Sequence, residues 1–239
     1  MLLASLVSSA VYAGAADYVY MPTVEYGERE IDFKFGTRTP ADTERQTVTS
    51  LGLGYGATEY WFTEFYLKRE VEGNASDVTV AEWENKFQLL ETGKYPVELG
   101  FITEIEAPIS ASGPWELKLG PLLQTEFGKL QLNGNLLFER QYSSDGSGEQ
   151  YPTEAFYQWQ IKYRLKTEFE FGAQGFGDMG EWDNWVGSKA EVNHSVGPAI
   201  FGKLALDNRQ AIKYNAAWLL CSGTGVADHT FRMQVEYEF

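Results

Sequence analysis

The chain ends in Phe231-Arg232-Met233-Gln234-Val235-Glu236-Tyr237-Glu238-Phe239, where apolar residues alternate with polar or charged ones. Successive side chains of a β-strand point to opposite faces, so this stretch has one apolar face and one charged face. Between residues 155 and 165 the same alternation places aromatic and aliphatic residues opposite glutamines and basic residues. Both stretches are predicted to be strands.

The alternation recurs from Pro22 almost to the last residue, and no stretch keeps the apolar spacing of an amphipathic helix. The sequence therefore predicts an all-β protein. Clusters of Gly, Pro, Asn and Asp divide it into about twelve strands. These are expected near residues 22–38, 45–58, 60–72, 78–91, 95–107, 114–126, 129–142, 153–165, 168–176, 196–206, 210–221 and 228–239.

The connections between these strands alternate between tight and long. Tight ones include 56–60, 128 and 207–209, whereas 143–152 and 177–195 are long. Short turns at one end and longer loops at the other are typical of a closed antiparallel up-and-down transmembrane β-barrel. We expect about twelve strands, with ten as the alternative, because an even number returns both ends of the chain to the same side.

Composition excludes several classes of protein. The 239 residues are 44% hydrophobic and carry a formal net charge of -15, which is unsuited to binding nucleic acid. No apolar run is long enough to predict a bundle of membrane-spanning helices. The single Cys221 cannot form an internal disulfide, and no motif predicts a cofactor or a metal site.

The first residues are typical of an export signal. Residues 2–12 are apolar, and small residues follow at Ala13, Gly14 and Ala15, although the basic start of such a signal is missing. We expect residues 1–15 to be a cleaved secretory segment and residues 16–239 to form a single barrel domain. A buried first strand or helix is the alternative.

The alternation alone does not say which face points outward, since a barrel in water and a barrel in lipid share it. Long charged side chains crowd the polar faces, which favours a polar interior and a lipid-facing exterior. Aromatic residues near the strand ends are then expected to form two girdles at the membrane interfaces. They are Tyr18, Tyr20, Tyr55, Trp61, Tyr95, Trp115, Phe127, Tyr142, Tyr151, Trp185 and Tyr237. A soluble exported barrel or sandwich is the alternative.

The C-terminal stretch resembles the last strand of Gram-negative outer-membrane β-barrel proteins, which end in alternating apolar residues and a terminal aromatic residue. The resemblance implies that Tyr237 and Phe239 are read by the barrel-assembly machinery, and that the protein is exported to the outer membrane and surrounded by its lipid. Residues 197–202 and 213–217 also look like small, mostly uncharacterised porin-like barrels of proteobacteria, some labelled as transporters of aromatic-compound pathways.

The charged faces supply the candidate pore-lining residues. They are Glu30, Asp32, Lys34, Glu64, Lys68, Glu82, Glu84, Lys86, Glu104, Glu116, Lys118, Glu139, Lys162, Arg164, Glu170, Arg232 and Glu236. Carboxylates outnumber bases, so an open lumen is expected to be weakly cation-selective for an unknown small solute. Paired charges filling the lumen are the alternative, as for Arg164 opposite Glu170, and would leave a closed structural or binding barrel.

Two further features are candidates for ligand contact. Gly52, Gly54 and Gly56 form a row without side chains that either opens a passage or relieves crowding in a curved wall. The longest loop carries the binding candidates Asp178, Glu181, Trp182, Asp183 and Trp185. Carboxylates and indoles suit a cation, a sugar or an aromatic ligand, but an anchoring loop is the alternative.

A lipid-modifying enzyme is the third possibility. Only His194 and His229 could serve as an imidazole base, and no nucleophile elbow or metal-ligand cluster is present. His194 and Ser195 are adjacent, so in a strand they point to opposite faces and cannot form a catalytic pair. We therefore expect no enzyme.

Overall fold

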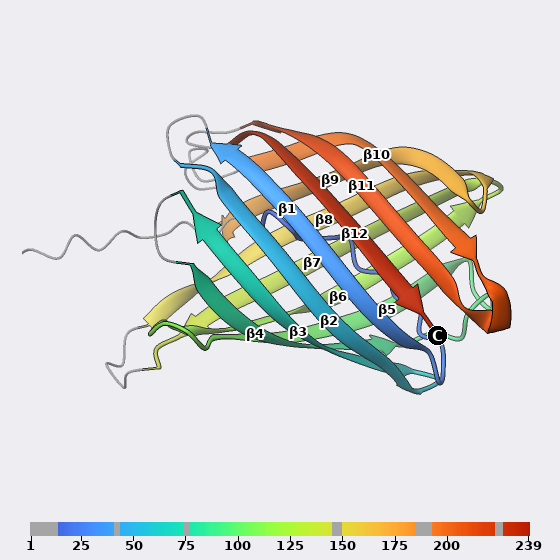
Figure 1. Ribbon diagram of the computed structural model, residues 1–239, viewed down its shortest axis with the longest axis horizontal. Helices are drawn as coiled ribbons and strands as arrows, with labels where there is room; N and C mark the ends of the chain where they lie inside the picture. The colour runs from blue at the N-terminus through green and yellow to red at the C-terminus, as the bar shows by residue number, and fades with distance from the viewer. Residues whose placement is uncertain (1–13, 41–43, 74–76, 145–149, 185–192, 223–226) are drawn as a thin grey trace, which may run out of the picture.

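The computed structural model describes residues 14–40, 44–73, 77–144, 150–184, 193–222 and 227–239. They form a closed barrel of twelve strands (Figure 1). The strands are β1 (Arg29–Pro40), β2 (Gln46–Thr58), β3 (Trp61–Glu72), β4 (Val78–Gln88), β5 (Val97–Pro108), β6 (Trp115–Phe127), β7 (Leu130–Tyr142), β8 (Gln150–Lys166), β9 (Phe169–Glu181), β10 (Asn193–Ala205), β11 (Ala211–Ser222) and β12 (Ala227–Glu238).

Each strand pairs antiparallel with its neighbours in the chain, and β1 pairs with β12 to close the sheet. The closure places Ile31 opposite Tyr237 and ends with a hydrogen bond from Phe239 N to Arg29 O of 2.9 Å. The predicted fold class, a closed antiparallel up-and-down barrel, is confirmed. Within the described ranges the one helix is a 3₁₀ turn at Asp207–Arg209, and no helix there could span a membrane.

Two strand predictions were wrong by five residues or more at a boundary. The first strand was expected from residue 22 but begins at Arg29, because the residues before it run inside the barrel. The ninth strand was expected to end at residue 176 but continues to Glu181, so the loop after it is shorter than predicted. In that extension Asn193 of β10 pairs with Asp178, which extends the ladder into the expected loop.

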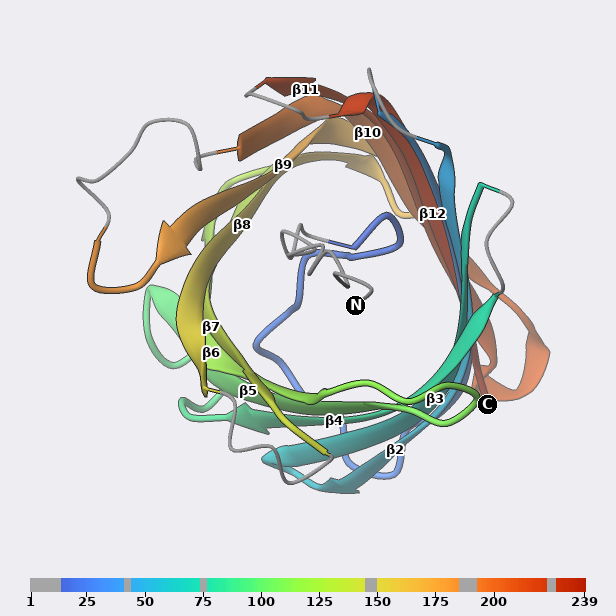
Figure 2. The ribbon, with the colours of Figure 1, turned by 90° about the vertical axis from the view of Figure 1, so that its left-hand side faces the viewer.

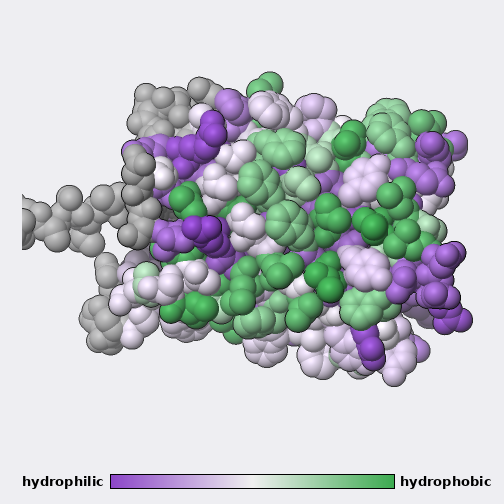
Figure 3. Space-filling view, in the orientation of Figure 1, coloured by the Kyte–Doolittle hydropathy of each residue, from purple (hydrophilic) through white to green (hydrophobic). Residues whose placement is uncertain are grey.

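The apolar faces of the strands point outward. On β1 the outward Ile31 and Phe33 are each 38% exposed, whereas the inward Asp32 is 0% exposed. Figure 3 shows hydrophobic side chains covering the middle of the visible face, with hydrophilic ones gathered toward its two ends. An apolar band between polar rims is the surface expected of a barrel in lipid.

Residues 14–28 form what we call the luminal segment, which runs through the interior before β1 starts. Figure 2 shows this first part of the chain inside the ring of strands. Ala15, Val19 and Tyr20 are 3%, 4% and 5% exposed. Tyr18 and Tyr20, expected at a membrane interface, therefore lie inside the barrel, and their assignment to the girdles was wrong.

Candidate channel lumen

All candidate pore-lining residues occupy inward register positions of their strands. On β3 and β4, for example, Glu64 and Glu84 are buried opposite each other, while the next residue pair, Phe65 and Trp83, is exposed to the outside. The strand alternation that grouped them on one face is therefore the alternation of the folded barrel, and that face points inward as expected. What the sequence did not predict is how closely these charges are paired.

The first charge cluster lies where the luminal segment crosses β1. Lys34 Nζ is 3.6 Å from Asp32 Oδ2 and lies over the rings of Tyr18 and Tyr66, 3.8 and 3.6 Å from their centroids. Asp32 also accepts hydrogen bonds from Tyr66 Oη at 2.8 Å and Gln234 Nε2 at 2.9 Å. The two aromatic rings thus stabilise the ammonium group of Lys34, while the Tyr66 hydroxyl and the Gln234 amide stabilise the carboxylate of Asp32.

A second cluster crosses β3 to β7. Lys118 Nζ bridges Glu104 at 2.9 Å and Glu139 at 3.5 Å. Lys68 Nζ bridges Glu82 at 3.0 Å and Glu106. Because each ammonium serves two carboxylates, this part of the wall keeps an excess of negative charge.

A third cluster lies at the end of the barrel with the short turns. Lys213 Nζ is 3.2 Å from Glu28 and 3.5 Å from Glu236. Burial raises the pKa of the Glu28 carboxyl, which opposes the effect of Lys213.

The predicted contact between Arg164 and Glu170 is present but long, at 4.0 Å. Arg164 lies closer to Glu126, at 2.7 Å, and Glu170 lies closer to Lys162, at 3.2 Å. The inner wall near this hairpin is thus a chain of alternating charges rather than one isolated pair.

Two groups of three carboxylates come close enough to hold a metal ion among the residues described. They are Glu28, Glu30 and Glu238, and Glu82, Glu104 and Glu106. In both groups a lysine ammonium already lies beside the carboxylates. The lysine offsets only part of the negative charge of each group, and no ion is needed to explain how the carboxylates are held together.

The luminal segment is held by apolar side chains that point inward. Val19 packs with Phe176, Ala199, Phe201, Ala217 and Leu219, whereas Tyr20 packs with Ile102, Leu122, Leu137 and Phe156. Apolar side chains on the inner wall are not expected unless another apolar segment packs against them. They interrupt the polar faces of β5 to β11. This break in the alternation of polar and apolar residues is the feature of the sequence that could have indicated an internal segment.

Polar contacts fix the same segment. Tyr18 Oη donates to Glu84 at 2.7 Å, and Tyr20 Oη donates to Glu104 at 2.6 Å. Burial, followed by these carboxylates, raises the pKa of both phenols well above the ordinary tyrosine value. Both hydroxyls therefore stay protonated and keep donating. Val24 N donates to Gln88 Oε1 at 2.8 Å.

Glycines in the wall give the segment room. A Cβ at Gly36 would lie 2.0 Å from Ala15 O, and one at Gly56 would lie 1.9 Å from Glu25 O. The row at residues 52 to 56 does not open a passage: a Cβ at Gly52 would meet the Tyr66 ring at 2.2 Å. These glycines relieve crowding, which is the alternative that the sequence left open.

The luminal segment lies between two separate cavities. One of about 820 Å³, the short-turn cavity, is lined by Tyr18 to Glu28 and by residues near the short turns. The other, of about 540 Å³, the long-loop cavity, is lined by Gly14, Ala15, Asp17 and the long-loop ends of the strands. Among the residues that the structure describes, none lines both cavities.

The structure does not gather the candidate binding residues of the longest loop. Asp178 is a buried strand residue whose Oδ1 accepts a hydrogen bond from Gly180 N at 2.8 Å. Glu181 ends β9, and Trp182, 54% exposed, and Asp183 follow it on the outside. Trp185 lies outside the described residues. The loop therefore offers no joint site among the residues described.

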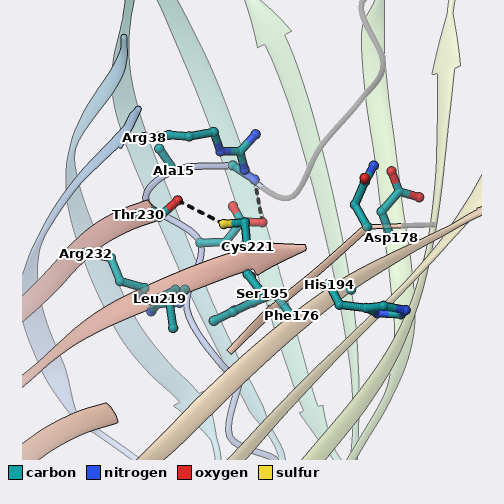
Figure 4. A pocket seen from close by; sticks show the side chains of 14 residues that line it. Ala15, Arg38, Phe176, Asp178, His194, Ser195, Leu219, Cys221, Thr230 and Arg232 are labelled. Carbon is teal, nitrogen blue, oxygen red and sulfur yellow. Dashed lines mark hydrogen bonds between the residues drawn. The ribbon is translucent and has the colours of Figure 1, made fainter. Parts of the chain in front are cut away.

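The arrangement around His194 separates it from nucleophiles. His194 is on the outer face, with Nδ1 2.5 Å from Tyr157 Oη, whereas Ser195 and Cys221 form an inward cross-strand pair (Figure 4). This matches the prediction that His194 and Ser195 point to opposite faces. His229 stacks on Trp218 with ring centroids 5.1 Å apart.

Comparisons with known proteins identify the fold alone. No protein-family profile and no curated protein sequence matches the chain. Among solved structures, the COG4313 outer membrane channel from Pseudomonas putida F1 is similar with a TM-score of 0.61 and 13% identity, covering 93% of this chain and 98% of that one. The NanC porin (0.58, 12% identity, 87% and 100% covered) and the KdgM porin (0.57, 9%, 88% and 99%) are similar too. The chain thus has the fold of outer-membrane β-barrel channels.

Proposed function

We propose that the protein is a narrow diffusion channel for small polar solutes in the outer membrane of a Gram-negative bacterium. Three features support this proposal: a fold shared with outer-membrane channels, an apolar exterior and a charged interior with a cavity at each end. The export signal would be cleaved before Gly14, because Gly14 and Ala15 belong to the luminal segment. The luminal segment would then set the narrowest cross-section, so we expect a low conductance.

The observation that carries a preference for cations is the lining of the long-loop cavity. Its acidic members are Asp17, Glu70, Glu72, Glu106, Glu116 and Glu139, and its basic members are Arg38, Lys68 and Lys118. Carboxylates lining a narrow entrance attract cations and repel anions. We therefore expect weak cation selectivity rather than free passage of either sign.

The test is single-channel recording of the refolded protein in a planar bilayer under a salt gradient. Discrete current steps, with a reversal potential shifted toward the equilibrium potential of the cation, support the proposal. A reversal potential on the anion side would contradict the selectivity. Heat-modifiable gel mobility, measured on the same sample, shows whether the barrel is folded.

A closed barrel that binds rather than conducts is the second candidate, and the luminal segment is the observation that favours it. In that case a barrel that migrates as folded would stay electrically silent. Removing residues 16–25 would then produce conductance that the full chain lacks.

We also propose that the C-terminal residues are the assembly signal. Tyr237 and Phe239 stack on the outer face, with ring centroids 5.6 Å apart, and Phe239 is 50% exposed. An exposed and a half-buried aromatic ring at the end of the chain that closes the barrel offer a surface to the barrel-assembly machinery.

A further inference from the structure

Arg232 is a buried base of the inner wall. It is 2% exposed, and its Nε and NH1 atoms have no hydrogen-bond partner among the residues described. Its guanidinium lies over the Phe176 ring, 4.7 Å from the centroid. A buried charge without a hydrogen-bonded partner is strongly destabilising, so a group that satisfies it is expected.

Five lysines of the wall differ from Arg232. The ammonium groups of five inward lysines lie between 2.9 and 3.6 Å from a carboxylate oxygen, namely those of Lys34, Lys68, Lys118, Lys162 and Lys213. In the strand register Arg232 stands instead between Gly36 of β1 and Ala217 of β11. Neither neighbour can offer an oxygen from its side chain.

A small cavity of about 40 Å³ lies at this position, lined by Arg232 together with Phe176, Leu219, Thr230 and Arg38 (Figure 4). About 10–15 Å³ on this scale holds one water, so the space suits a few waters or one carboxylate group. Two carboxylates also line it: Asp17, whose Oδ2 accepts a hydrogen bond from Gly14 N at 2.8 Å, and Asp178, whose Oδ1 accepts one from Gly180 N at 2.8 Å. Together with Arg38 and Arg232 they leave the lining with as many arginines as carboxylates.

The small cavity adjoins the long-loop cavity. Gly14, Ala15, Asp17 and Arg38 line both. A molecule with a carboxylate in the small cavity would thus have about 540 Å³ for the rest of its body. A guanidinium matches the two oxygens of a carboxylate with parallel hydrogen bonds, which a lysine cannot do.

We propose that Arg232 is the docking point for the carboxylate group of small organic acids that enter from the long-loop end. The proposal rests on the proposed channel function, since it names a substrate class for the same lumen. The bulk lumen prefers cations, and this single site holds an anionic group long enough to orient the solute.

Saturation-transfer difference NMR on the detergent-refolded barrel tests the site without requiring conductance. The probes are propionate and its uncharged counterpart propionamide. We expect saturable binding of propionate, at least tenfold weaker binding of propionamide, and a tenfold or greater loss of propionate binding in Arg232→Gln. The matched control is Arg164→Gln, an inward arginine at the other end, which should bind propionate as the parent chain does. Equal propionate binding by Arg232→Gln would overturn the proposal.

A second measurement covers the case in which Arg232→Gln does not refold. A ligand that binds only the folded state stabilises it, so propionate should raise the temperature at which the unaltered barrel loses its folded gel mobility. The same concentration of propionamide should leave that temperature unchanged. No rise with propionate would overturn the site. A barrel that conducts but fails both tests would support the channel proposal and contradict the carboxylate site. A barrel that binds propionate but does not conduct would support the site and contradict the channel proposal.

Discussion

Single residues of this protein behave according to the face of the sheet on which they stand. Leu53 is 64% exposed on the outer face of β2, while Gly52 beside it faces the Tyr66 ring. A charge on the outer face is moved into hydrocarbon, whereas a charge on the inner face joins a network of ion pairs. The same substitution therefore has different effects on neighbouring residues.

Leu53→Arg, near the middle of β2, is expected to destabilise the barrel by about 2–4 kcal/mol, and Leu53→Asp by less, because the cost of a charge is greatest at the bilayer midplane. The measurement is equilibrium unfolding in urea, in lipid vesicles. Leu204→Arg, close to the short-turn end of β10, is the depth control and should cost about 0–1 kcal/mol. Equal costs at both positions would mean that the outer face does not lie across lipid.

Tyr20→Phe removes the hydroxyl that donates to Glu104 inside the barrel. Losing a donor to a buried acceptor is expected to lower the free energy of unfolding by about 1–3 kcal/mol. The measurement is the urea concentration at which half of the protein loses the gel mobility of the folded barrel. The control is Tyr26→Phe, since Tyr26 is 65% exposed and should be neutral. A neutral Tyr20→Phe would show that the luminal segment is not held by this hydrogen bond.

At the scale of elements, the luminal segment depends on gaps in the strands around it. It crosses β1 at Gly36 and β2 at Gly56, and its side chains fill apolar positions of β5 to β11. The segment and the strands are therefore complementary surfaces, and a change in the wall acts on the segment.

Gly36→Ala places a Cβ 2.0 Å from Ala15 O, so the segment must shift. We expect a larger single-channel conductance or a wider spread of conductance levels than in the parent protein. Gly134→Ala is the matched control, because a Cβ there would meet nothing within 4 Å. Identical recordings from both variants would mean that the segment does not set the cross-section.

β12 closes the barrel, and its end carries the proposed assembly signal. Deleting Phe239 is expected to reduce the heat-modifiable barrel recovered from cells and to leave unfolded protein. Phe127→Ala is the control, since Phe127 is also an exposed aromatic residue at a strand end, 65% exposed. Normal barrel levels without Phe239 would remove the assembly claim.

At the scale of the whole molecule, net charge and its distribution decide the selectivity. The chain has 34 acidic and 19 basic residues, and the barrel turns many of its acids inward. Cation preference then depends on how many carboxylates are ionised at a given pH.

Lowering the pH from about 7 to about 4 is expected to reduce the cation preference, because carboxylates with ordinary pKa values near 4 become neutral. Glu28 lines the short-turn cavity, and its raised pKa means that it loses its charge earlier in this descent. The reversal potential under a fixed salt gradient should therefore move toward zero. A reversal potential that does not change with pH would exclude the carboxylates as its origin.

The sequence by itself determined the class of fold and which residues of each strand share a face, and it favoured twelve strands over ten. These follow from local rules: the period of a strand, the chemistry of turns and the evenness of a closed antiparallel sheet. That Glu30 shares a face with Asp32 needs no knowledge of distant residues, whereas the inward direction of that face was inferred from the many long charged side chains it carries. The end of β9 was missed because the glycines and the aspartate between residues 177 and 181 look like a loop until β8 and β10 pair with this stretch.

Only the tertiary structure decided what occupies the interior. Tyr18 and Tyr20 look like interface aromatics in sequence, since their partners Glu84 and Glu104 are far away along the chain. Arg232 resembles any inward base until its neighbours turn out to be Gly36 and Ala217. Strand alternation is local, whereas the filling of a closed lumen depends on which distant side chains the closure brings together.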